Sequence, residues 1–157
     1  MAIVAIVVHQ QRPEAMAVAL GAARWLTEQG HRVVVPHTDA ADTGLHEWSA
    51  PLADISGDLD LAVSVGGDGT MLRTIELVLD HEVPVLGVNC GQLGYLTDVD
   101  GDASISALED FLAGRHRVER RLALDVEVVR TGETTRHRAL NEVVVETTQS
   151  GHTVRLA

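Results

Sequence analysis

The sequence predicts an α/β protein with a parallel sheet, followed by the start of an all-β domain. Over residues 1–116, continuous apolar runs alternate with segments of helical spacing, the order expected for strands joined by helical crossovers. After residue 117 the pattern changes: apolar and polar residues alternate with a period of two over residues 122–128, which is typical of a strand with one face in solvent. These two observations predict two domains, residues 1–116 and 117–157.

The first domain is expected to begin with a strand, a helix and a second strand. Residues 2–8 are apolar and β-branched, the pattern of a strand that is buried on both faces. Apolar residues then recur at helical spacing between Pro13, which a first helical turn tolerates, and Gly30, which ends the helix. A second strand is expected over residues 32–35, and residues 37–57 are interpreted as a long connection.

Two further strand-and-helix units complete the expected first domain. The apolar run over residues 59–65 predicts a third strand, and the helical spacing over residues 71–81 predicts the next helix. Residues 84–88 form the fourth expected strand. A loop rich in glycine separates that strand from a short helix expected over residues 104–112.

The second domain is expected to consist of antiparallel hairpins. One strand alternates over residues 122–128, Gly132 marks a turn, and further strands are expected over residues 136–147 and 152–157. Such a set of strands does not cover its own apolar face. We therefore expect an incomplete domain and association into a homo-oligomer.

The composition excludes several functional classes. The formal net charge of −11 argues against a nucleic-acid partner, which requires a basic surface. All 12 basic residues are arginine, which excludes a Walker A loop because that loop needs a lysine. The apolar opening over residues 1–8 is too short to span a membrane, so no membrane partner is expected. The single cysteine, Cys90, favours a reducing compartment and therefore the cytoplasm.

The pentapeptide GGDGT lies between the third expected strand and the helix after it. In open parallel sheets, ligands bind outside the carboxyl ends of the strands. Glycines let the backbone approach a ligand closely, and the amides at the start of a helix favour phosphate. The candidate phosphate-binding residues are Gly66, Gly67, Gly69 and Thr70. The carboxylate of Asp68 is suited to accept a proton from a hydroxyl or to act near a metal ion; alternatively, it caps the helix.

Three segments together resemble the NAD kinase family. GGDGT is shared with lipid kinases and, more remotely, with phosphofructokinases. The segment PVLGVNCGQLGYLT over residues 84–97 and the segment ALNEVV over residues 139–144 are similar to NAD kinases in particular. Lipid kinases usually carry Asn-Glu directly after GGDGT and one further residue, where this chain has Met71, Leu72 and Arg73.

The resemblance implies a nucleotide-kinase fold that transfers a phosphoryl group from ATP, or from polyphosphate, to the adenosine ribose 2′-hydroxyl of NAD, giving NADP. NAD and ATP are the implied substrates. Mg²⁺ or another divalent cation is expected with ATP, no residue of the chain is named as a metal ligand, and no tightly bound organic cofactor is expected. Asp68 matches the family's catalytic carboxylate, the proton acceptor. The implied NAD contacts are Asp68, Gly69, Arg73, Asn141, Glu142 and His152.

Two alternatives remain open at this point. A lipid kinase that shares GGDGT would phosphorylate diacylglycerol or a sphingoid base and would be indifferent to NAD. NAD kinases continue beyond this point through a β-rich domain with a Gly-Ser-Thr-Ala segment, so the resemblance implies that this chain is the N-terminal portion of a longer kinase. A catalytically incomplete fragment of this kind would bind nucleotide without turnover. Neighbouring residues of a regular strand point to opposite faces, so Asn141 and Glu142 contact one ligand only at a bend or bulge.

Overall fold

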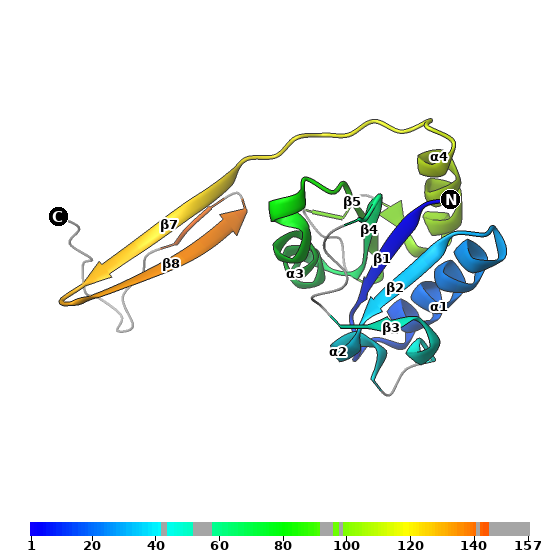
Figure 1. Ribbon diagram of the computed structural model, residues 1–157, viewed down its shortest axis with the longest axis horizontal. Coiled ribbons are helices and arrows are strands. Elements are labelled where there is room, and N and C mark those ends of the chain that lie inside the picture. The colour runs from blue at the N-terminus through cyan, green and yellow to red at the C-terminus, as the bar shows by residue number, and fades with distance from the viewer. Residues whose placement is uncertain (42–43, 52–57, 92–95, 98, 141, 145–157) are drawn as a thin grey trace. The chain divides into compact units, whose positions relative to one another are not determined.

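The computed structural model describes residues 1–41, 44–51, 58–91, 96–97, 99–140 and 142–144. The chain divides into two compact units, Met1–Val118 and Glu119–Ala157, and each is described by itself. The first unit is an α/β structure with a parallel sheet, and the second contains an antiparallel hairpin (Figure 1). The fold class expected from the sequence is therefore confirmed.

The first unit is built on a six-stranded parallel sheet in the order β3-β2-β1-β4-β5-β6. Its strands are β1 (Ile3–Val8), β2 (Arg32–Pro36), β3 (Ser49–Ala50), β4 (Leu61–Gly66), β5 (Val85–Asn89) and β6 (Val99–Asp100). The central strands β1 and β4 pair from Val4 with Leu61 to Val8 with Val65. The chain adds strands outward from β1 on one side and outward from β4 on the other, so the strand order reverses between these two.

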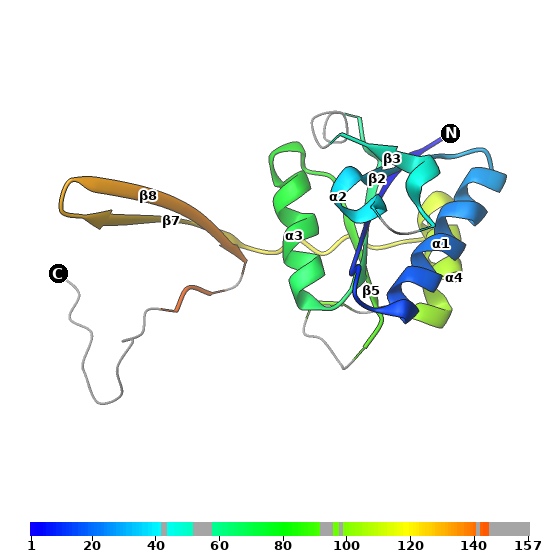
Figure 2. The same cartoon turned by 90° about the horizontal axis from the view of Figure 1, so that it is seen from below.

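Helices cover both faces of this sheet (Figure 2). Helices α1 (Pro13–Glu28) and α4 (Ser104–Leu112) lie on one face, where Ile6, Leu26 and Leu108 are fully buried in the larger core cluster. Helix α3 (Asp68–Val78) lies on the other face, and the short 3₁₀ turn η3 (Leu79–His81) follows it. The second core cluster contains smaller side chains, namely those of Ala5, Val34, Ala62 and Val78.

The expected connection over residues 37–57 contains short elements that the sequence did not predict. Among the described residues of this connection, they are helix α2 (His37–Ala40), the 3₁₀ turn η1 (His46–Trp48) and strand β3. Elements of two to four residues are too short to show a hydrophobic period. Trp48 anchors this region, because its side chain packs against the larger core and its Nε1 donates a hydrogen bond to Thr27 Oγ1 at 3.0 Å.

Helix α3 begins earlier than the sequence predicted. The apolar spacing placed its start at Met71, whereas the helix begins at Asp68 with Gly67 as its N-cap. Glycine has a low helix propensity, so the apolar period becomes recognisable only after Gly69. The consequence is that Asp68, Gly69 and Thr70 form the first helical turn rather than a loop before it.

The second unit contains the hairpin of β7 (Ala123–Arg130) and β8 (Glu133–Leu140). Gly132, in the turn between them, has φ of 83°, a left-handed conformation that glycine adopts without strain. This tight turn pairs Arg130 with Glu133 and Ala123 with Leu140. The predicted second strand over residues 136–147 is therefore wrong in its bounds, and the strand predicted over residues 152–157 lies outside the described residues.

None of the described helices combines the length and the apolar character needed to cross a membrane.

Candidate functional site

A cavity of about 430 Å³ lies at the carboxyl ends of the two central strands. One wall is the segment that follows β1, and the other is the start of α3, which follows β4. The reversal of strand order between β1 and β4 makes this a topological switch point, the place where open parallel sheets bind ligands. The cavity is lined by Val8, His9, Gln10, Gln11, Arg12, Gly67, Asp68, Gly69, Thr70 and Arg73.

The glycines of GGDGT allow the two walls to approach each other. A Cβ on Gly66 would lie 2.4 Å from Thr70 Oγ1 and 3.0 Å from the Cβ of His9, so a side chain at this position would force the walls apart. Gly66 ends β4 and does not itself line the cavity, whereas Gly67, Gly69 and Thr70 do. The first N–H groups of an α-helix generally lack intrahelical acceptors, although here that of Thr70 donates to the carbonyl oxygen of Gly67 at 3.0 Å, and the helix dipole favours negative charge at this end. This wall is therefore suited to bind an anion.

Asp68 is the carboxylate among the residues that line the cavity. Its Oδ1 accepts a hydrogen bond from the backbone N–H of Leu96 at 3.1 Å, which ties the segment after β5 to the start of α3. Asp68 is the first residue of the helix and not its N-cap, and the cap, Gly67, has no side chain to serve that role. The simple helix-capping alternative therefore does not describe this carboxylate.

Arg12 supplies positive charge from the wall that follows β1. It is the N-cap residue of α1, and its Nη1 donates a hydrogen bond to the carbonyl oxygen of Cys90 at 3.2 Å. Burial raises the pKa of the Cys90 thiol; the charge of Arg12 acts in the opposite direction, and that of Glu14 raises the pKa further. A raised pKa makes the Cys90 thiol less reactive as a nucleophile.

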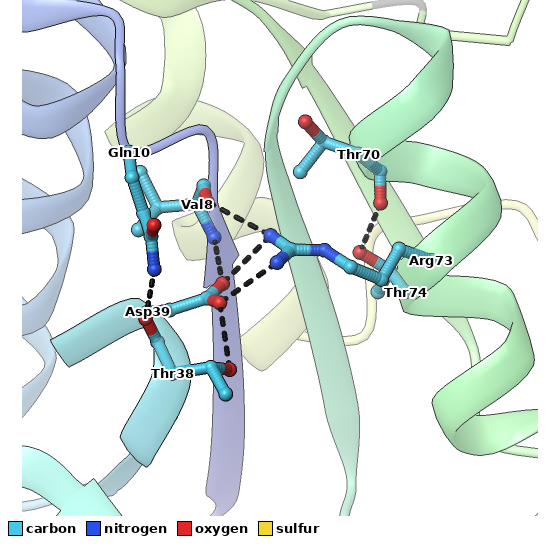
Figure 3. A network of polar contacts seen from close by, with 7 residues as sticks. All are labelled: Val8, Gln10, Thr38, Asp39, Thr70, Arg73 and Thr74. Atoms are coloured by element: carbon cyan, nitrogen blue, oxygen red, sulfur yellow. Dashed lines mark hydrogen bonds and ion pairs between the residues drawn. The ribbon is translucent and has the colours of Figure 1, made fainter. Parts of the chain in front are cut away.

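Arg73 supplies positive charge from α3 and is held by a buried carboxylate (Figure 3). Its Nη1 lies 2.9 Å from Asp39 Oδ1, and its Nη2 lies 2.8 Å from Asp39 Oδ2 and 2.9 Å from the carbonyl oxygen of Val8. Asp39 also accepts hydrogen bonds from the backbone N–H of Val8 at 2.8 Å and from Thr38 Oγ1 at 3.1 Å. These contacts join α2, the end of β1 and α3.

Sequence reasoning missed Asp39 and left out His9. Asp39 follows β2 by three residues, and a signal existed, because an acidic residue after the second strand of such a sheet often faces the ligand crevice. His9 directly follows β1, and its Nδ1 is buried without a hydrogen-bond partner among the described residues. A lone histidine after a strand is too common a pattern to predict such a position.

Of the expected site residues in the second unit, the structure describes Glu142. Glu142 lies two residues after the end of β8, and its N–H donates to the carbonyl oxygen of Leu140 at 3.1 Å. Asn141 and His152 lie outside the described residues. In the part of the chain that the structure describes, no three His, Cys, Asp or Glu side chains are grouped so that they could hold a metal ion.

Comparisons with known proteins identify the family. The family model described as the ATP-NAD kinase N-terminal domain matches residues 4–116. The chain is 37% identical over 153 residues to the NAD kinase of Sodalis glossinidius, covering 96% of this chain and 52% of that protein. It is 41% identical over 143 residues to the NAD kinase of Heliobacterium modesticaldum, covering 90% of this chain and 50% of that protein.

A solved structure shares the fold. The crystal structure of yeast NADH kinase in complex with NADH superposes with a TM-score of 0.78 at 19% sequence identity, over 88% of this chain and 46% of that one. The chain thus spans about half the length of the curated relatives it matches. By the family model and by these relatives, the chain belongs to the NAD kinase family.

Proposed function

We propose that the protein transfers the terminal phosphoryl group of ATP, or of polyphosphate, to the adenosine ribose 2′-hydroxyl of NAD, giving NADP. Family membership supports the reaction class. The observation that carries the proposal for this chain is the position of Asp68, which lines a cavity at the switch point of the sheet beside the first turn of α3. A carboxylate can accept the proton of a hydroxyl, and the helix start beside it can bind a phosphate.

In the proposed reaction, the 2′-oxygen of NAD attacks the terminal phosphorus while its proton passes to the carboxylate of Asp68. The bond between that phosphorus and the bridging oxygen breaks, and ADP leaves with the electron pair. Phosphoryl transfer depends mainly on positioning and charge stabilisation. The cavity is lined by the start of α3 and by Arg12 and Arg73. The amides of that helix start and the two guanidinium groups would position the phosphates and stabilise their negative charge.

The residues present are compatible with a magnesium ion that arrives with the donor. Mg²⁺ at such sites usually binds one or two carboxylates and completes its coordination with substrate phosphates and water. Asp68 lines the cavity and offers such a carboxylate, whereas Asp39 is fully buried in its contact with Arg73. When bound, the metal ion neutralises charge on the transferring phosphates.

The second candidate is a nucleotide-binding portion that needs further residues for turnover. It is favoured by the extent of the match, because the chain covers about half the length of its relatives. The family match leaves the lipid-kinase alternative without support. The proposed NAD contacts of Asn141, Glu142 and His152 apply to both candidates, as does a cytoplasmic location, which rests on the single cysteine.

The deciding experiment is NADP formation by the purified chain from NAD and Mg-ATP, followed with an NADP-specific dehydrogenase. Polyphosphate in place of ATP tests the donor, and NADH in place of NAD tests the acceptor. Diacylglycerol serves as the lipid control. Turnover with NAD supports the kinase proposal. Absence of turnover in a chain shown by circular dichroism to be folded supports the incomplete-portion candidate.

Gly87 provides a test of how the Leu96 contact supports Asp68. A Cβ on Gly87 would lie 3.1 Å from the Cα of Thr97 and 3.2 Å from the carbonyl oxygen of Leu96, and these backbone atoms cannot rotate away. Gly87→Ala is therefore expected to displace this segment and to lower the rate of NADP formation about tenfold. Gly21→Ala in α1 makes the same change where a Cβ meets nothing within 4 Å, so its rate is expected to equal wild type. Equal rates for both variants would contradict the role of this contact.

We also propose that the protein forms a homo-oligomer. Support comes from apolar side chains in and beside the hairpin, where Leu122, Val129 and Val144 are at least 70% exposed. Exposed apolar surface of this kind favours association. Size-exclusion chromatography with light scattering is expected to give a mass above that of one chain, and a monodisperse monomer would contradict the proposal.

A further inference from the structure

The carboxylate of Asp39 is fully engaged inside the protein. Its side chain is 1% exposed, and within the described part of the chain it is contacted by two donors from Arg73, one from the backbone of Val8 and one from Thr38. An ionised carboxylate has about four acceptor positions, so these contacts fill them. In dinucleotide-binding sheets, an acidic residue after the second strand binds a ribose hydroxyl. Asp39 has no accessible oxygen for that purpose, and its partner is an arginine instead.

Arg73, by contrast, is only half covered. Its side chain is 46% exposed, and it lines the cavity that also contains Asp68. Its Nη2 donates twice and its Nη1 once, so Nε–H and the second N–H of Nη1 have no partner among the described residues. Asp39 therefore fixes one edge of the guanidinium while donors on the rest of the group stay available to a ligand.

The chemistry on the two sides of Arg73 indicates where an anion would bind. Arg73 also borders a second cavity of about 290 Å³, which includes Glu76 and the apolar side chains of Val7, Pro36 and Leu77. A carboxylate and apolar walls disfavour a phosphate. The first cavity combines Arg73 with Arg12 and with the first-turn amides of α3. The charges and donors thus favour the first cavity for an anion.

We propose that Asp39 is a positioning residue for substrate: its buried carboxylate holds the guanidinium of Arg73 at the cavity beside Asp68, so that Arg73 contacts the phosphate chain of a bound nucleotide. This inference rests on the proposed function for the identity of the nucleotide. The phosphate contact itself requires only the cavity and the contacts between Asp39, Val8 and Arg73.

A positioning role and a purely electrostatic role of Asp39 predict opposite changes in the affinity for an anion when Asp39 is neutralised. If Asp39 acted only through its charge, then neutralising it would make the cavity more positive and would strengthen anion binding. If Asp39 positions Arg73, then Asp39→Asn removes the bidentate partner and releases the guanidinium into many rotamers, and anion binding weakens. The direction of the change separates the two roles.

The experiment measures binding of inorganic tripolyphosphate to the purified chain by isothermal titration calorimetry at low ionic strength. Asp39→Asn and Arg73→Gln are each expected to weaken binding about tenfold. The double variant is expected to be no weaker than Arg73→Gln alone, because both changes remove the same contact. Asp60→Asn is the matched control: Asp60 accepts a hydrogen bond from the backbone of Ile3 at the opposite end of β1, at 2.7 Å, so this variant is expected to bind like wild type.

Several outcomes would overturn the inference. They are no binding of tripolyphosphate by the wild-type chain, equal or tighter binding by Asp39→Asn, and additive losses in the double variant. Should Asp39→Asn fail to fold, Arg73→Lys keeps the charge but not the planar fork that Asp39 grips, and binding as tight as wild type would overturn it equally. Because binding is measured without turnover, a chain that shows these losses but makes no NADP overturns the proposed function and leaves this inference standing.

Discussion

Asp68→Asn is expected to lower the rate of NADP formation by roughly 10² to 10⁴-fold, the range that a positioned general base contributes. The affinity for NAD is expected to stay within a few-fold of wild type. An amide cannot take up the proton of the 2′-hydroxyl at neutral pH. It still offers an oxygen to the N–H of Leu96, so the contact between the segment after β5 and the start of α3 is retained. The loss therefore belongs to the transition state and not to the ground state.

The measurement for Asp68 is a comparison of kcat and KM for NAD in the coupled assay, together with NAD affinity by calorimetry. Asp60→Asn again serves as the control, because Asp60 directly precedes β4, contacts the backbone of Ile3 and does not line the cavity. A fall in kcat with an unchanged dissociation constant supports the role of proton acceptor. Parallel losses of rate and affinity would show instead that Asp68 is a ground-state ligand.

Ile6→Ala is expected to lower the free energy of unfolding of the first unit by about 3–4 kcal/mol, the cost of a cavity in a well-packed core. Ile6 is 0% exposed at the centre of β1 and belongs to the larger core cluster. Ile6→Val removes a single methylene and is expected to cost about 1 kcal/mol. The difference between the two variants measures how tightly the helices on this face pack against the central strand.

Urea denaturation followed by tryptophan fluorescence tests this prediction selectively. Both tryptophans of the chain, Trp25 and Trp48, lie in the first unit, so the signal reports the unfolding of that unit. Val129→Ala is the control, because Val129 lies in β7 of the second unit and is 72% exposed. A midpoint for Ile6→Ala that equals that of Val129→Ala would contradict the packing described for β1.

The long elements of the fold follow from local patterns in the sequence. Strands β1 and β4 are runs of apolar residues that a doubly covered parallel strand requires, and α1 has both a proline start and a glycine stop. Strands β3 and β6 contain two residues each, and only pairing with a neighbour makes them strands. The sequence contains no local signal for such elements.

The part of the candidate site that lies in one contiguous segment was predictable from the sequence, and the part that depends on strand order was not. GGDGT is contiguous, so its role at the start of a helix is apparent from the residues alone, and with the segments around residues 90 and 141 it identified the family. The contact of Asp39 with Arg73 depends on strand order, which brings the end of β2 next to β1 and beneath α3. The spatial order of strands is not encoded in any one segment, and therefore neither this contact nor the wall that follows β1 was predicted.

The pairing of β1 with β4 has a consequence for how the protein folds. The cavity walls follow strands whose residues are distant in the chain, since Val4 pairs with Leu61 and Val8 with Val65. Closing so long a loop costs chain entropy before any contact is gained, and such non-local pairing is slow. The β1–α1–β2 segment, which emerges before β4 during synthesis, has one wall of the cavity and lacks the other. Nucleotide binding is therefore expected to arise only once β1 has paired with β4, and the bound nucleotide is expected to stabilise that pairing.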